Sequence, residues 1–108
     1  MNLRETRSGA VTVLTLSGRL DGLSAPTLEA HTTRLVAEDA KRLVFDCSEL
    51  NYISSAGLRV FLATAKQMQS LGGRCGFAAL SPATRQIFQL SCLFELLEVH
   101  DTLADACA

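Results

Sequence analysis

The alternation of short apolar runs with a longer helical pattern restricts the fold of this sequence more than any other feature. Residues 42–47, R-L-V-F-D-C, form one apolar run, and residues 54–71 carry the strongest helical periodicity of the chain. A glycine pair, which is a typical helix stop signal, separates this segment from a second apolar run at residues 74–80. Strands connected by a helix usually pair in parallel and are covered on both faces. The sequence therefore predicts a sheet with parallel strands and helices packed on it.

The segment before this unit predicts a hairpin and a helix. Residues 3–7 and 11–16 alternate in character on either side of Ser8-Gly9, which indicates two antiparallel strands. A helix is expected to begin after Ser24, its N-cap, to carry a proline in its first turn and to end near Asp39.

The segment after this unit continues the alternation. Ser81-Pro82 opens a predicted helix that ends near Leu90. A short strand at residues 97–99 and a final helical turn at residues 102–106 follow. The predicted fold class is therefore α/β, with one small domain over residues 1–108 in which helices pack on a mixed β-sheet.

Composition and charge narrow the range of partners. Hydrophobic residues make up 48% of the 108 residues and charged residues 19%, which is typical of a globular domain with one core. The net charge is -1 and no block of like charge occurs, so neither nucleic acid nor a membrane is expected as a partner. The chain shows no secretory signal pattern and no apolar run of roughly 18 residues. A cytoplasmic protein is expected, and the lack of a long heptad pattern favours a monomer.

The cysteines and glycines give no sign of a cofactor. The four cysteines form no C-x-x-C pair and no zinc-ligand spacing, and the chain has no glycine motif for a nucleotide. We expect reduced, structural cysteines, no metal and no cofactor.

Apolar side chains fall on two sides of the predicted helix at residues 54–71. With Leu58 as the centre of the helical wheel, one side is expected to face the sheet. Its members are Leu58, Phe61, Leu62, Ala65 and Met68. The opposite side carries Ala56, Val60, Ala63 and Gln67, with Arg59 on its flank. This second side is either ordinary surface or a docking surface for another protein.

Two serines and a glycine stand at the predicted start of this helix. Free N–H groups at a helix start favour an anion such as a phosphoryl group, and no acidic residue between Ser54 and Val60 occupies them. Gly57 is a poor helix former, and its missing side chain leaves room either for another molecule or for internal packing. Plain N-capping by a serine explains the same residues, so both interpretations stay open.

Two enzyme classes can be weighed on these residues. A serine hydrolase would need the motif G-x-S-x-G, but Ile53 replaces the first glycine, and His31 and His100 are expected at the surface rather than as bases. Asp46 raises the alternative of a response regulator, which would need further acidic residues to hold Mg²⁺. Asp46 is instead expected to cap the end of a strand, and the chain is not expected to be an enzyme.

Three segments together resemble a known family. D-C-S-E-L-N-Y-I-S-S-A-G-L-R-V, residues 46–60, closely resembles the central signature of STAS domains, in particular the small single-domain anti-sigma factor antagonists of bacteria. G-R-L-D-G-L-S-A-P-T-L-E, residues 18–29, is similar to a second family segment, and L-S-P-A-T-R-Q-I-F-Q-L-S, residues 80–91, to a third. The three segments occur in the right order over nearly the whole chain, which makes the resemblance more specific than any single motif.

The resemblance implies a regulatory function by partner switching. The unphosphorylated antagonist would bind an anti-sigma factor, a serine kinase with a histidine-kinase-like ATPase fold, and so free a sigma factor or another client. The kinase would phosphorylate Ser55 and release the antagonist, and a PP2C-type phosphatase would reverse the reaction. Asp21 matches the family's acid in the first loop. The implied partner-binding residues are Asp21, Leu23, Ser24, Ser54, Ser55, Ala56, Gly57, Arg59, Val60 and Ala63.

The chain departs from the family pattern beside Ser55. Many members have an aspartate before the phosphorylated serine and a hydroxyl residue after it, whereas this chain has Ser54 and Ala56. Ser54 is therefore an alternative, minor target. A second function on the same fold is that of a STAS subunit of an ABC-type lipid transporter, bound to its ATPase.

Overall fold

The computed structural model describes all 108 residues and contains one five-stranded mixed sheet. The strands lie in the order β1 (Asn2–Ser8), β2 (Val11–Leu20), β3 (Arg42–Ile53), β4 (Arg74–Ala78) and β5 (Glu98–His100). The first pair is antiparallel, as the hairpin pattern predicted, and every later pair is parallel. The predicted α/β class and mixed sheet are confirmed.

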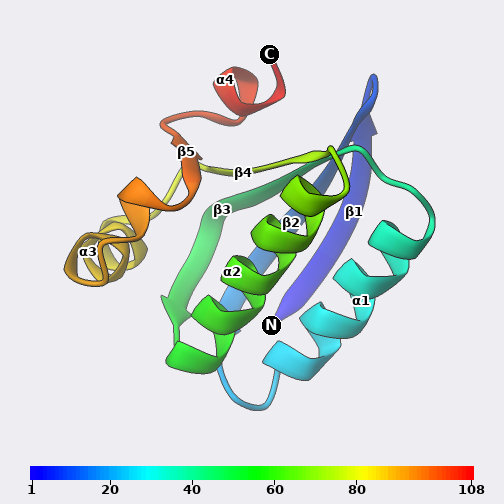
Figure 1. Ribbon diagram of the computed structural model, residues 1–108. Helices are drawn as coiled ribbons and strands as arrows, with labels where there is room; N and C mark the ends of the chain where they lie inside the picture. The colour runs from blue at the N-terminus through cyan, green and yellow to red at the C-terminus, as the bar shows by residue number, and fades with distance from the viewer.

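Four helices and one 3-10 turn connect and cover the strands. They are α1 (Ala25–Ala37), α2 (Ser55–Ser70), α3 (Pro82–Leu90), the turn η1 (Leu93–Glu95) and α4 (Leu103–Cys107). Figure 1 shows α1 and α2 side by side across one face of the sheet, with α3 at the left, beside β3. None of these helices combines the length and the apolar character that a membrane crossing requires.

Alternation of side chains along the strands, interrupted by irregularities in β2 and β3, builds a core on each face of the sheet. In β3, Phe45 faces α1 and α2, while its neighbour Val44 faces the other way. The larger core holds 20 buried residues and is centred on stacked phenylalanines: the ring of Phe45 lies 5.0 Å from that of Phe77 and 4.9 Å from that of Phe61. The smaller core is closed by Ala106 of α4.

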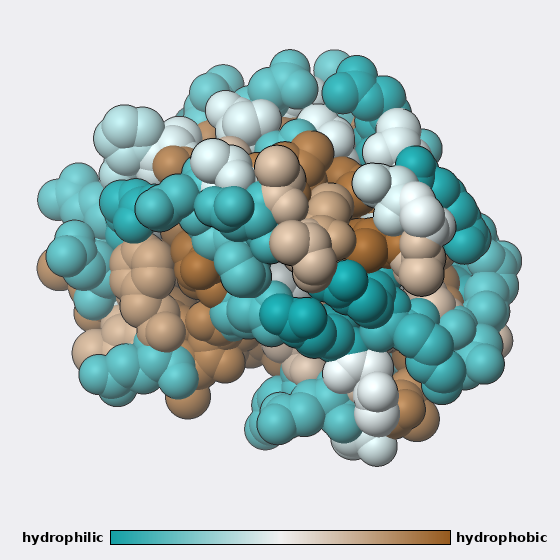
Figure 2. All heavy atoms as spheres, turned by 90° about the horizontal axis from the view of Figure 1, so that it is seen from above, coloured by the Kyte–Doolittle hydropathy of each residue, from teal (hydrophilic) through white to brown (hydrophobic).

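The end of the molecule that carries α4 has a mixed surface. Viewed from above, hydrophilic atoms dominate its rim, and apolar atoms gather at its centre and on the side where α3 lies (Figure 2). Leu90 and Leu96, which belong to α3 and the segment after η1, are 78% and 70% exposed.

Strands β2 and β3 run further than the sequence predicted. They contain 10 and 12 residues, and their carboxyl ends lie next to each other, because Leu20 and Ile53 are register partners. The backbone N–H of Ser54 donates to the carbonyl oxygen of Leu20 at 2.8 Å. This bond ties the loop after β2 to the start of α2.

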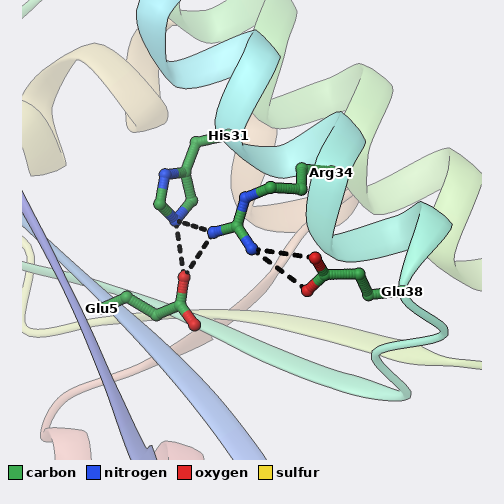
Figure 3. Close-up of polar contacts among 4 residues, drawn as sticks. All are labelled: Glu5, His31, Arg34 and Glu38. Carbon is green, nitrogen blue, oxygen red and sulfur yellow. Dashed lines mark hydrogen bonds and ion pairs between the residues drawn. The ribbon is translucent and has the colours of Figure 1, made fainter.

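A polar network holds β1 against α1 (Figure 3). Nε2 of His31 and a guanidinium nitrogen of Arg34 lie 2.7 and 2.8 Å from the same carboxylate oxygen of Glu5, and Arg34 also binds Glu38. An ionised carboxylate can only accept hydrogen bonds, so Nε2 of His31 is the donor to Glu5. Nε2 of His31 and the Arg34 nitrogen lie 3.1 Å apart because both donate to the same oxygen of Glu5. The hydrogen bond from His31, supported by Arg34, lowers the pKa of Glu5, although desolvation opposes the shift.

Candidate functional site

The loop between β2 and α1 and the start of α2 form one continuous end of the molecule. Both follow the carboxyl ends of neighbouring parallel strands, which is where binding sites of α/β sheets usually lie. The sequence-predicted residues Asp21, Leu23 and Ser24 come from the loop, and those from Ser54 to Ala63 come from α2. The fold therefore brings the two predicted groups to one end of the sheet.

The two serines at the start of α2 have different environments. Ser54 is the N-cap, with extended φ and ψ of -91° and 173°, and its Oγ accepts a hydrogen bond from the N–H of Gly57 at 3.3 Å. Ser55 is the first helical residue, is exposed, and its hydroxyl makes no hydrogen bond within the chain. The capping interpretation is thus right for Ser54, while the hydroxyl of Ser55 stays free.

Gly57 is required by packing inside the protein. A Cβ at this position would lie 2.7 Å from Cγ of Leu20 and 2.9 Å from Cγ1 of Ile53, closer than side-chain carbons come in proteins. Of the two interpretations of the missing side chain, room for another molecule or internal packing, the structure supports internal packing. Gly57 lets the ends of β2 and β3 approach α2, and it is buried.

The buried face of α2 is rotated from the predicted one. It consists of Gly57, Val60, Phe61, Thr64 and Met68. Val60, which the helical wheel placed on the outer side, is only 5% exposed, so its predicted outward position is wrong. Thr64 lies within the buried face because its hydroxyl donates to the carbonyl oxygen of Val60 at 2.8 Å, which satisfies its polarity.

A shallow groove between α1 and α2 contains three members of the predicted outer side of α2, Ala56, Val60 and Ala63. Its volume is ≈ 300 Å³. From α2 it is bordered by half-buried Ala56 and by exposed Arg59 and Ala63, and from α1 by Pro26 and Glu29. Gly22, Ala25 and Val60 also line it. The accessible part of α2 beside Ser55 is therefore small and partly apolar, as a docking surface requires.

The loop after β2 is organised by Asp21. Its Oδ1 accepts hydrogen bonds from the backbone N–H groups of Leu23 at 3.0 Å and Ser24 at 3.2 Å. These bonds, that of Ser24 first, lower the pKa of Asp21. Leu23 at the tip of the loop is 92% exposed. The loop thus presents an apolar side chain beside an ionised carboxylate.

Ser24 holds this loop together and does not cap α1 with its side chain. It occupies the N-cap position, but its φ and ψ of -96° and -21° are helical, and its hydroxyl makes no capping bond. Instead its Oγ accepts from the N–H of Asp21 at 2.9 Å and donates to the carbonyl oxygen of Arg19 at 3.0 Å. The predicted N-cap is right in position and wrong in mechanism.

The residues weighed for enzyme classes have other partners. His31 pairs with Glu5, and Nε2 of His100 lies 2.8 Å from an oxygen of Glu98, so both histidines are half-buried rather than free at the surface. Asp46 lies within β3 and accepts from Oγ1 of Thr15 at 3.4 Å and from the N–H of Ser48 at 3.1 Å, so it does not cap a strand end. No group of three His, Cys, Asp or Glu side chains is close enough to hold a metal ion.

The cysteines divide into two kinds. All four are free thiols; Cys47 and Cys75 are buried, Cys107 is half-buried and Cys92 is exposed. Burial raises the pKa of Cys47, and burial together with the charge of Glu98 raises the pKa of Cys75 to about 12. The expected structural role thus applies to the two buried cysteines, Cys47 and Cys75, and not to the exposed Cys92.

Sequence reasoning missed two side chains at this end of the sheet. The guanidinium carbon of Arg19 lies 4.2 Å from the ring centroid of Tyr52, in stacked cation–π contact. The two residues are register partners across β2 and β3 only because the ladder contains an irregularity between Gly18 and Arg19. No periodic pattern in the sequence signals such a shift.

Comparisons with known proteins agree with this architecture. The model of the STAS domain matches residues 2–106. A candidate anti-sigma factor antagonist of Bordetella bronchiseptica, BtrV, is 32% identical over 108 residues, which is all of this chain and 93% of the relative. The crystal structure of an anti-sigma factor antagonist from Mycobacterium paratuberculosis is 30% identical and superimposes with a TM-score of 0.91, covering 98% of this chain and 90% of that one.

A more distant structure shares the fold alone. The Bacillus cell fate determinant SpoIIAA in its phosphorylated form is 20% identical, has a TM-score of 0.77 and covers 98% of this chain and 96% of that one.

Proposed function

The chain belongs to the STAS domain family, and from this premise we propose that it is an anti-sigma factor antagonist whose unphosphorylated form binds an anti-sigma factor. The relatives that match nearly its full length at 30% identity or more bear this function in their names. The proposed contact surface is the end of the sheet that Asp21, Leu23, Ser24, Ser54, Ser55, Ala56, Arg59 and Ala63 form. The buried residues Gly57 and Val60 shape this surface from below.

The observation that carries the proposal is the exposed hydroxyl of Ser55, which has no hydrogen bond, beside Ser54, whose hydroxyl already caps the helix. A kinase needs an accessible hydroxyl, and only Ser55 offers one at the start of α2, because Ser54 is half-buried and caps the helix. We assign phosphorylation to Ser55 for this reason. A SpoIIAA structure in a phosphorylated form exists within the same fold, which agrees with regulation of this kind.

Phosphate on Ser55 would release the partner by electrostatics alone. It adds roughly -1.5 to -2 charges at pH 7, next to Ala56 and Ala63, which docking would dehydrate. An ion buried without a partner costs several kcal/mol, and about 1.4 kcal/mol already changes affinity tenfold. The N–H groups at the start of α2 can accommodate the phosphate, so the fold need not change.

The resemblance to anti-sigma factor antagonists implies the partners of this reaction. The anti-sigma factor acts as the serine kinase and transfers a phosphoryl group to Ser55 from ATP bound in its own histidine-kinase-like site. A PP2C-type phosphatase removes this phosphate and restores the hydroxyl. This places the proposed cycle in the cytoplasm, where ATP is available. The chain needs no cofactor of its own for it.

Intact-mass measurement tests the assignment. The chain is incubated with ATP and the anti-sigma kinase of its source organism, and wild type, Ser55→Ala and Ser54→Ala are compared. We expect a gain of one phosphate in wild type and in Ser54→Ala and none in Ser55→Ala. An equal gain in Ser55→Ala would move the site to another residue.

Binding measurements test the switch. Ser55→Asp is expected to weaken binding to the kinase by at least about tenfold, with a melting temperature close to that of wild type, because an acidic side chain suits the first turn of a helix. Wild-type affinity of this variant would contradict the charge mechanism. Stable association of wild type with a transporter ATPase, in place of a kinase, would favour the lipid-transporter alternative.

A further inference from the structure

We propose that Arg19, held by stacking on Tyr52, binds a carboxylate of the partner protein and so determines partner specificity. The proposal rests on the proposed function, because it extends the same docking surface. The two residues of the proposal, Arg19 and Tyr52, were not among the site residues predicted from the sequence.

An irregularity in the sheet positions Arg19. Gly18 pairs with Leu50 and Arg19 pairs with Tyr52, so β3 contains one unmatched residue, Asn51. Gly18 has a φ of 90°, a region that side chains with a Cβ rarely adopt. Bulges of this kind redirect side chains beside binding sites. Here the bulge places Arg19 opposite an aromatic ring.

One face of the Arg19 guanidinium packs on the Tyr52 ring, and the N–H groups at its edge make no hydrogen bond within the chain. The ring of Tyr52 covers the guanidinium at 4.2 Å, and Nε of Arg19 forms a long ion pair with Oδ2 of Asp21 at 3.9 Å, without a hydrogen bond. The side chain is 64% exposed, and its nitrogens donate no hydrogen bond within the chain. A planar guanidinium with free N–H groups matches a carboxylate with two parallel bonds. Because stacking already restricts its rotamers, binding loses less entropy.

The surroundings point to a carboxylate on a protein. A hollow of ≈ 590 Å³ next to Arg19 is also lined by Asp21 and by Leu23, which is 92% exposed. The groove between α1 and α2, which also reaches Gly22 of this loop, is lined by a second exposed cation, Arg59. An apolar centre with a charged rim is typical of protein interfaces, and two rim arginines complement acidic side chains. The occupant is therefore an Asp or Glu side chain of the anti-sigma factor.

Affinity measurements with the anti-sigma kinase test the proposal. Arg19→Gln is expected to weaken binding about tenfold, as the loss of a charged hydrogen bond does. Arg19→Glu should weaken it more, and Tyr52→Leu should weaken it about threefold because the guanidinium loses its support. Tyr52→Phe keeps the ring face and should bind as wild type. The matched control is Arg7→Gln, which removes an exposed arginine near the β1–β2 turn, at the far end of the sheet.

Charge reversal on the partner distinguishes contact from altered folding. Each acidic residue of the kinase's binding face is replaced by Arg, and one of these variants is expected to restore binding of Arg19→Glu while weakening binding of wild type. If wild type binds the kinase and Arg19→Gln binds equally well, the inference fails and the proposed function stands. If wild type binds no anti-sigma factor, both fail.

Discussion

Single residues at the start of α2 divide the structural tasks from the proposed regulatory one. Ser54 closes the helix and Gly57 lets the strands approach, while the hydroxyl of Ser55 is left outside the packing. Modification of Ser55 therefore changes the surface and leaves the interior intact. This division is what allows one phosphate to control binding in the proposed function.

Replacing Gly57 by alanine tests the packing account. The added methyl group would meet Leu20 and Ile53 at less than 3.0 Å. Overpacking of this kind costs roughly 1 to 3 kcal/mol, and the better helix propensity of alanine recovers up to about 1 kcal/mol. Because three contacts lie below 3.0 Å, the upper part of this cost applies, and we expect a net loss of about 1 to 2 kcal/mol in the free energy of unfolding, measured with urea.

Gly22→Ala is the matched control, since a Cβ at this position would have no neighbour within 4 Å and its φ is not in the left-handed region. It should leave the unfolding midpoint nearly unchanged. If Gly57→Ala were as stable as wild type, the close approach of β2 and β3 to α2 would not depend on the glycine.

Residue-level predictions from the sequence succeeded where chemistry was local. The roles of Ser54 and Ser81 as N-caps follow from their positions before helical patterns, and both side chains accept the expected backbone N–H. The prediction that Val60 is exposed was wrong, because a helical wheel based on hydropathy does not place Gly57 and Thr64 on the buried face. Their small size, and the bond of the Thr64 hydroxyl to the helix, turn that side of α2 towards the core.

At the scale of elements, the polar network of Figure 3 fixes α1 against the edge strand β1. The pKa of Glu5 is lowered in the folded protein, first by the hydrogen bond from His31 and then by Arg34. A carboxyl with a lowered pKa stabilises the fold above its ordinary value of 4.5 and loses this effect as the pH falls through the folded pKa.

Glu5→Gln tests this contribution. At pH 7 the variant should unfold with a free energy lower by about 1 kcal/mol, the typical value of a hydrogen bond to a charged group at a partly exposed site. Below pH 4.5 the difference from wild type should shrink. Urea unfolding of both proteins from pH 3 to pH 7 measures it, and parallel curves over this range would contradict the role of Glu5.

The elements themselves were largely predictable. Ser8-Gly9, Gly72-Gly73 and Ser81-Pro82 mark chain reversals and helix ends whose local chemistry does not depend on the rest of the fold. The lengths of β2 and β3 were not predictable, because their last residues are strand only through pairing with each other. The stacked pair of Arg19 and Tyr52 depends on the same pairing, so no sequence pattern could predict it.

At the scale of the whole molecule, the buried thiols report on global unfolding. Cys47 and Cys75 both lie in the larger core, where burial raises their pKa and removes them from solvent. In native protein at pH 8 we expect a thiol reagent to modify Cys92 quickly and these two only as fast as the protein unfolds.

Replacing both Cys92 and the half-buried Cys107 by serine removes the fast phase if this account is right, and urea exposes the buried pair. Labelling sites are identified by peptide mass. Rapid native modification of Cys47 would mean that the sheet opens locally beneath α1 and α2.

The position of the first residue has a practical consequence. The backbone of Met1 passes 3.7 Å from where a Cβ of Gly18 would lie, and Met1 lines the same hollow as Arg19 and Leu23. The carboxyl terminus follows α4 at the other end of the molecule in Figure 1. An affinity tag or fluorescent reporter fused ahead of Met1 would crowd visiting proteins, whereas the same fusion after Ala108 would leave them free access.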